Sequence, residues 1–126
     1  MITSYINESE TVSTINGIIE NKRFHIELTP NSATKKMREH LPLNIRMADL
    51  NGNEKYAYLL EHLPTQREQV RRIEKGDVML FGSNCLVIFY QTFSTNYSYT
   101  KIGKIKEVEQ LDFMLETDAV NVLLTP

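Results

Sequence analysis

Short runs in which every second residue is apolar are the feature that most constrains the fold of this chain. The runs "FHIEL" (24–28) and "LNIRM" (43–47) both have this period of two, which is typical of β-strands with one buried face. The dipeptide Asn51-Gly52 follows the second run, and both residues tolerate the positive φ angles of a tight hairpin turn. The sequence therefore predicts short antiparallel strands joined by tight turns.

The same reasoning predicts about eight strands and two short helices along the chain. Strands are expected at 11–19, 24–28, 43–47, 54–60, 77–81, 85–90, 101–105 and 119–125. Apolar residues four apart predict a helix that begins at Pro30 or Ser32 and is closed by Pro42. The spacing of Val108, Leu111 and Leu115 predicts a second helix. Residues 61–76 are expected to form a long polar connection, and 91–100 a polar loop that carries aromatics.

Many short strands in a chain of 126 residues predict a mainly β fold, a closed eight-stranded barrel with the two helices at its ends. Residues 1–10 are expected to be a tail, and residues 11–126 the barrel domain. The alternation places the following residues in the barrel core: Phe24, Ile26, Leu28, Val87, Phe89, Val120 and Val122.

Composition and charge exclude several classes of function. The formal net charge is −2 with no basic cluster, so we expect no binding to nucleic acid or membranes. The single cysteine, Cys85, cannot form an internal disulfide, and we expect it to be buried and unreactive. His25, His40 and His62 lack metal-ligand spacing, so we predict no metal and no cofactor. The amino terminus lacks a secretory pattern, which predicts a cytoplasmic protein.

Several stretches resemble a known family. "IELTPNSATKKMREHLP", "LNGNEKY", "GDVMLFGSNCLVIFY" and "YSYTKIGKI" are similar, in order, to stretches of the small bacterial cyclophilin-like proteins, a family without an established activity. The resemblance covers roughly residues 11–126 and implies a cyclophilin-like barrel. True cyclophilins are peptidyl-prolyl isomerases that bind proline in an apolar pocket on the outside of the barrel.

The resemblance carries over poorly to the isomerase residues. Tyr99 stands where cyclophilins have a histidine, and Arg46 is the nearest counterpart of their catalytic arginine. Their apolar pocket residues have no equivalents in "LNGNEKYAY". Alternation places Arg46 on the outside of the barrel, where it is either a solvated charge or, if isomerase activity remains, the catalytic donor.

The candidate binding site lies in "EKYAYLL". Ala57 and Leu59 suit the barrel interior, which places Glu54, Tyr56 and Tyr58 outside. Two further residues of the 91–100 loop, Tyr97 and Tyr99, are expected to close the same groove, with that loop as a mobile wall. Alternatively, the tyrosines only cover the sheet beneath the long loop.

These observations predict a binding module that holds a peptide segment or a small ligand in an external aromatic groove, without efficient catalysis. A reduced peptidyl-prolyl isomerase is the alternative from the enzyme class. A protein that pairs with itself or a partner through the barrel edge is the third. The sequence leaves the oligomeric state, the ligand and the partner open.

Overall fold

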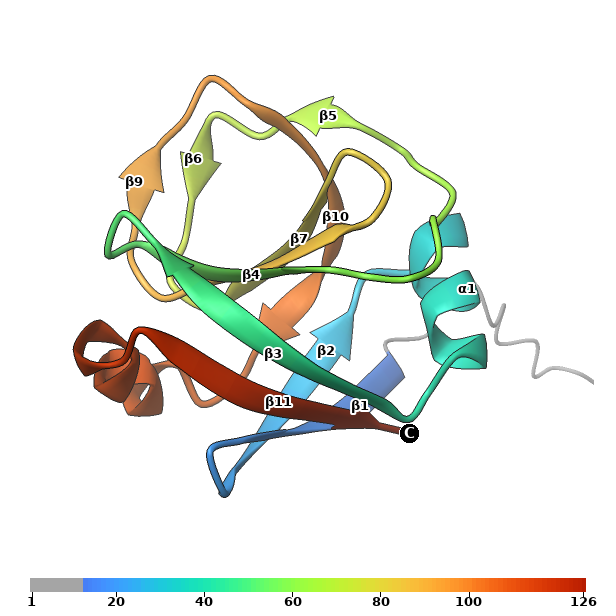
Figure 1. The fold of residues 1–126 in the computed structure, drawn as a ribbon. Helices are drawn as coiled ribbons and strands as arrows, with labels where there is room; N and C mark the ends of the chain where they lie inside the picture. Colours follow the sequence, from blue (N-terminus) through green and yellow to red (C-terminus); the bar gives the residue numbers. More distant parts are fainter. Residues whose placement is uncertain (1–12) are drawn as a thin grey trace, which may run out of the picture.

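The structure is a computed structural model that describes residues 13–126. Eight of its strands form the wall of a barrel: β1 (Ser13–Ile19), β2 (Lys22–Leu28), β3 (Leu43–Leu50), β4 (Glu54–Tyr58), β7 (Asp77–Phe81), β8 (Cys85–Phe89), β10 (Ser98–Ile105) and β11 (Ala119–Thr125). Their order is β2-β1-β11-β3-β4-β8-β7-β10, all pairs are antiparallel, and pairing of β10 with β2 closes the barrel (Figure 1). The predicted closed eight-stranded barrel is confirmed.

Tight turns connect neighbouring strands as the sequence indicates. Asn51 and Gly52 have φ angles of 56° and 66° between β3 and β4, as a reversing two-residue turn requires. Glu20 and Asn21 have φ angles of 47° and 72° between β1 and β2. Such turns match the twist of the strands that they join, so they fix the register of both hairpins.

A helix covers each end of the barrel. The helix α1 (Ser32–Glu39) begins after Asn31, whose side-chain oxygen accepts a 2.9 Å hydrogen bond from the Thr34 amide. A 3₁₀ helix, η2 (Val108–Glu116), precedes β11 at the opposite end (Figure 1). The helices bury apolar residues in the barrel core: Ala33 and Met37 from α1, and Leu111 and Met114 from η2. Leu115, expected on the buried face of the second helix, is 53% exposed.

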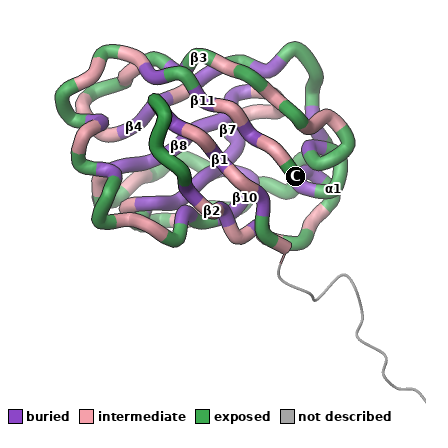
Figure 2. The backbone as a smooth tube through the Cα atoms, turned by 90° about the horizontal axis from the view of Figure 1, so that it is seen from below, coloured by how far each residue is buried: buried purple, intermediate pink, exposed green. Residues whose placement is uncertain are grey.

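The barrel wall separates two apolar clusters. The larger fills the interior and includes Phe24, Ile26, Leu28, Val120 and Val122, as predicted. Val87 and Phe89 are buried as predicted, but they lie in the smaller cluster on the outer face and not in the barrel interior. Leu86, Ile88 and Tyr90 take the interior positions instead. All five residues of β8 are buried (Figure 2), so alternation in the sequence could not tell its two faces apart.

The two long connections cover this outer face. The 61–76 segment contains β5 (Glu68–Gln69) and β6 (Arg72–Ile73), and β6 pairs with β9 (Phe93–Ser94) from the later loop. The segment was expected to be a long polar connection, and the two short strands within it were not predicted; Ile73 is fully buried in the outer cluster. The expected tail at 1–10, and residues 11–12 of the expected first strand, lie outside the described residues.

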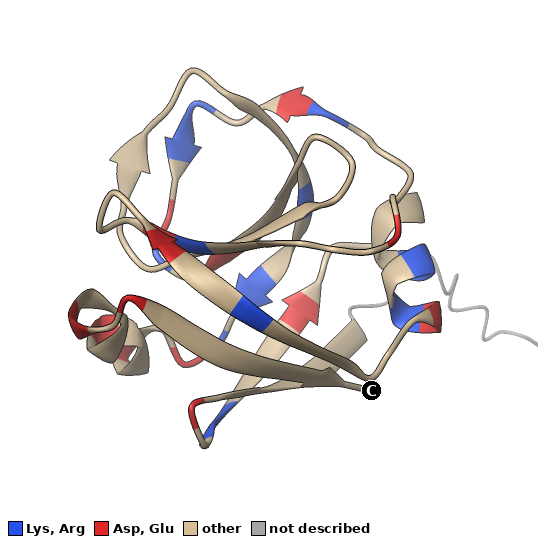
Figure 3. Ribbon diagram, viewed as in Figure 1, with Lys and Arg blue, Asp and Glu red and all other residues tan. Residues whose placement is uncertain are grey.

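Charged residues of both signs are mixed on the strands and helices (Figure 3). Within residues 13–126 no helix has the length and apolar character needed to cross a membrane.

Candidate functional site

The strand β4 divides its residues between the two faces of the barrel wall. Lys55 and Ala57 are buried on the interior side, whereas Tyr56 packs against the outer cluster. Tyr58 shares the outer face and is 69% exposed, with its ring centroid 6.0 Å from that of Tyr56 in an edge-on arrangement. Glu54, two residues before Tyr56, also points outward. The structure thus brings these three predicted site residues together on one face.

The two tyrosines of the later segment behave differently from one another. Tyr97 is 64% exposed, and its ring lies edge-on to Phe81 with a centroid distance of 5.8 Å. Tyr99 belongs to β10 and is only 4% exposed, because it packs against Phe81 and Phe89 at centroid distances of 5.7 and 5.6 Å. Tyr99 is therefore part of the outer cluster, and the expectation that it belongs to a mobile loop wall is wrong.

Strand register places three side chains in one row across the outer face. Tyr58 on β4 and Phe81 on β7 are both paired with Cys85 on β8. Residues directly opposite in antiparallel strands project to the same side. Adjacent strands lie ~4.8 Å apart, so the Tyr58 and Phe81 backbones are roughly 10 Å apart with the small Cys85 between them. Phe81 is 45% exposed, and the sequence analysis did not single it out as a site residue.

The thiol of Cys85 is free, buried and poorly suited to nucleophilic chemistry. Burial, and then the negative charge of Glu54, raise the pKa of Cys85 above its ordinary value. A raised pKa keeps the thiol protonated at neutral pH, and the thiolate is the reactive form. Cys85 therefore contributes a small apolar surface between the two aromatic side chains.

The exposed fraction of Glu54 is only 9%, which is unusual for a carboxylate. It lies opposite Phe89 in the β4–β8 pair. Burial, and then the charge of Asp49, raise the pKa of Glu54 to about 7. Among the described residues, no hydrogen bond or ion pair reaches its carboxyl group, and its oxygens are not among the fully buried atoms that lack a partner.

Arg46 is exposed on β3 and donates a 3.0 Å hydrogen bond from Nη1 to Oδ1 of Asn121 on β11. The β3–β4 pairing extends from Leu50 to Ala48 only, so Arg46 lies beyond the paired stretch. Arg46 is in phase with Ala48, which is paired with Tyr56, so it shares the outer face, but its guanidinium is held toward β11, the neighbour of β3 on the side opposite to β4.

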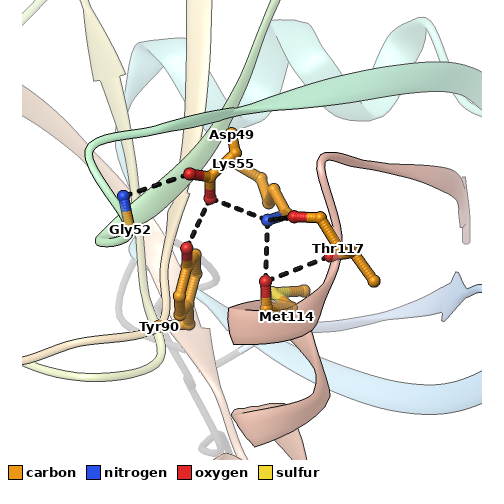
Figure 4. Close-up of polar contacts among 6 residues, drawn as sticks. All are labelled: Asp49, Gly52, Lys55, Tyr90, Met114 and Thr117. Carbon is orange, nitrogen blue, oxygen red and sulfur yellow. Dashed lines mark hydrogen bonds and ion pairs between the residues drawn. The ribbon is translucent and has the colours of Figure 1, made fainter.

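Lys55 is the polar residue of the barrel interior that sequence reasoning did not interpret. Its side chain is fully buried, and Nζ donates 2.8 Å hydrogen bonds to Oδ1 of Asp49 and to the carbonyl oxygens of Met114 and Thr117 (Figure 4). The ammonium also lies 4.8 Å from the ring centroid of Tyr90. Its position in phase with Ala57 is the sequence signal that places it inside.

This interior network has a structural role, because every N–H group of the Lys55 ammonium donates to an acceptor within the fold. An ammonium has three donors, and each has an oxygen acceptor here. The Tyr90 hydroxyl donates to Oδ1 of Asp49, and the Gly52 amide donates to Oδ2 at 3.1 Å. The network ties the end of η2 to the β3–β4 hairpin (Figure 4). Within the described part of the chain, no three His, Cys, Asp or Glu side chains are grouped as a metal site.

One family model matches the chain. It is the model of the cyclophilin-like family, and it covers residues 18–125, from the end of β1 to the end of β11. No curated protein and no solved structure matches the chain. The family match spans nearly the whole described barrel and agrees with its closed antiparallel topology. The chain belongs to the cyclophilin-like family.

Proposed function

We propose that the protein binds a peptide segment or a small apolar ligand on the outer face of its barrel, without efficient catalysis. The binding surface is the aromatic patch, defined as Tyr58, Phe81 and Tyr97 around Cys85. The observation that carries the proposal is the row Tyr58–Cys85–Phe81, in which two half-exposed or exposed aromatics flank one small buried residue.

A row of exposed aromatic side chains is energetically unfavourable in water and therefore indicates an interaction site. Large apolar side chains gain about 25 cal/mol for each Å² that leaves water, so a folded chain normally covers them. Tyr58, Phe81 and Tyr97 remain 69%, 45% and 64% exposed although an apolar cluster lies directly beside them. Contiguous exposed apolar surface of this kind marks interaction sites. Tyrosine suits such a site because it combines a flat apolar face with a polar tip.

The rest of the outer cluster supports the patch from below. Phe81 is held by Tyr99, and Tyr99 is held by Phe89, both through ring contacts under 6 Å. On the other side Tyr58 leans on Tyr56, which is half-buried. Rings fixed in this way lose little conformational entropy when a ligand binds between them, which favours affinity.

Titration followed by ¹⁵N NMR tests the proposal, with two capped tetrapeptides that differ only in proline or alanine at one position. We expect binding of at least one peptide to shift the amide resonances of Tyr58, Phe81, Cys85 and Tyr97 selectively. Tyr58→Ala and Phe81→Ala should each weaken binding at least tenfold, consistent with loss of an aromatic anchor. Leu115→Ala, which removes an exposed apolar side chain on η2, is the matched control and should leave binding unchanged.

Shifts confined to residues outside the patch, or no shift with either peptide at millimolar concentration, would refute the proposal. The isomerase alternative makes a different prediction: rapid prolyl cis/trans exchange that disappears in Arg46→Ala. The contact of Arg46 with Asn121, on the side away from β4, favours binding over catalysis. Action in the cytoplasm stays a prediction from the sequence.

A further inference from the structure

We propose that the ligand of the aromatic patch carries an ammonium group, and that this group pairs with the carboxylate of Glu54. The inference rests on the proposed function and adds the chemical class of the ligand. It assigns a binding role to Glu54, a buried acidic residue for which the fold offers no cation of its own among residues 13–126.

The burial of Glu54 without a partner is the first observation. Its exposed fraction is only 9%, yet none of the hydrogen bonds and ion pairs within the described residues involves its carboxyl group. Burial of a charge costs several kcal/mol unless a partner or a hydrogen bond compensates it. Asp77 on β7 is also buried, and it has partners of its own, because its carboxylate accepts a hydrogen bond from the Glu74 amide and pairs with Lys104. Among the described residues, Nε2 of His40 is the only buried side-chain nitrogen or oxygen without a hydrogen-bond partner, so the oxygens of Glu54 are not fully enclosed. A carboxylate on the outer face that no cation of the fold neutralises is open to a cation from outside.

The position of Glu54 on the outer face of β4 is the second observation. Glu54, Tyr56 and Tyr58 share the outer face of β4, so the carboxylate lies on the same face as the patch. Its charge raises the pKa of both Cys85 and Tyr99, after burial as the larger cause. Cys85 lies at the centre of the Tyr58–Cys85–Phe81 row, so the field of the carboxylate reaches the place where the ligand would lie.

The chemistry of the neighbours selects an organic cation. Phe89 lies opposite Glu54, Tyr56 follows on the same face, and Tyr99 contacts Phe89. Aromatic faces attract cations through their quadrupoles, and a carboxylate adds a charged hydrogen bond. The negative charge of Glu54 would repel an anionic ligand here. A lysine side chain or another primary amine joined to an apolar group satisfies both parts of the site at once.

Two matched probes test the inference: phenethylammonium and the uncharged 2-phenylethanol, each titrated by NMR at pH 8.5 and pH 5.5. We expect the ammonium probe to bind at least about tenfold tighter than the alcohol at pH 8.5, as a charge-assisted hydrogen bond provides. The advantage should shrink at pH 5.5, where Glu54 is protonated. In Glu54→Gln the two probes should bind equally at both pH values, whereas Glu109→Gln on η2 should behave as wild type.

The other ionisable groups around Glu54 do not confuse this pH comparison. Burial alone would raise the pKa of Asp49, but hydrogen bonds from Lys55 and Tyr90 lower it, so it stays ionised throughout. Burial, and then Glu54, raise the pKa of Cys85 and Tyr99, the latter to about 12, and burial likewise raises that of Tyr90. These three stay neutral from pH 5.5 to 8.5.

Two results would overturn the inference in distinguishable ways. Equal affinity of both probes in wild type at pH 8.5, with shifts at Tyr58 and Phe81, would remove the ammonium partner and leave the aromatic patch standing. Absence of shifts at the patch with either probe would remove the proposed function, and this inference with it. Because the wild-type pH series alone separates these results, the test does not depend on the folding of Glu54→Gln.

Discussion

Tyr58 and Phe81 lie on opposite sides of Cys85, each directly paired with it, although 23 positions of sequence separate the two aromatics. Both side chains project from the outer face of the barrel, and both keep a large exposed fraction. Val87 and Phe89 follow Cys85 on the same face of β8, and both are buried. The residues of the proposed binding site and those that stabilise the fold therefore occupy the same face of β8 and its neighbours, and they differ in burial.

This difference predicts the effect of two phenylalanine substitutions on stability. Phe89→Ala should lower the free energy of unfolding by roughly 3–5 kcal/mol, because Phe89 is fully buried and leaves a cavity. Phe81→Ala should lower it by less than about 2 kcal/mol, because much of that ring is already in water. Urea unfolding of both variants measures the difference, and equal midpoints for the two would contradict the outer cluster as described.

The interior lysine predicts a second effect on stability. Lys55→Met keeps the volume of the side chain but leaves the Asp49 carboxylate and the Met114 and Thr117 carbonyls without their donor. Breaking a buried ion pair by removing one partner costs roughly 3–5 kcal/mol. Urea unfolding should show a loss of this size.

The matched control is Lys36→Met, which removes an exposed lysine that pairs with Glu39 at 3.5 Å on α1. An exposed pair of this kind contributes at most about 0.5 kcal/mol, so the unfolding midpoint should barely move. If Lys55→Met behaved like the control, the interior network would not tie η2 to the barrel.

The sequence was informative where only one face of an element is buried. In β2 the alternation of Phe24, Ile26 and Leu28 with polar residues fixed the inward face correctly. In β8 both faces are apolar because both are covered, so the pattern could not assign Val87 and Phe89 to the outer cluster. The short pair β6–β9 was missed because two-residue strands carry no periodicity.

The candidate site was predicted in part for the same reason. Glu54, Tyr56 and Tyr58 could be placed on the outer face from alternation within one strand. Phe81 joins Tyr58 only through the register of β4, β8 and β7, and register between strands is a tertiary property. That Glu54 has no partner among residues 13–126 could not be read from the sequence, because it depends on every neighbour in the fold.

Barrel closure predicts the effect of a glycine substitution on stability. Gly103 lies in β10 opposite Leu28 of β2, and a Cβ atom there would be 2.4 Å from the Glu27 carbonyl oxygen. Gly103→Ala should push these two strands apart and lower the free energy of unfolding by roughly 1–3 kcal/mol. At Gly17 the nearest atoms to an added Cβ are side-chain carbons 3.5 Å away, so Gly17→Ala should change it by less than about 0.5 kcal/mol. Thermal unfolding that ranks the two variants in the reverse order would contradict the close approach of β10 and β2.

Glu54 predicts a dependence of stability on pH in the absence of ligand. Its pKa is about 7 in the folded protein against an ordinary value of 4.5, so the folded state retains a proton that the unfolded state has lost. Stability should therefore be greatest below pH 4.5 as far as this group is concerned, and should fall as the pH rises through 7. The expected loss between pH 5 and pH 8 is about 1–3 kcal/mol.

Urea unfolding of wild type and Glu54→Gln at pH 5 and pH 8 isolates this contribution. Burial alone would raise the pKa of Asp49 and Glu107, but hydrogen bonds keep it low, so both carboxyl groups titrate below this range. The variant should lose less stability than wild type from pH 5 to pH 8, because the amide cannot ionise. An equal loss in both proteins would mean that Glu54 ionises at an ordinary pKa. A carboxylate that ionised so easily would already be well solvated, and it would then gain little from pairing with an ammonium group.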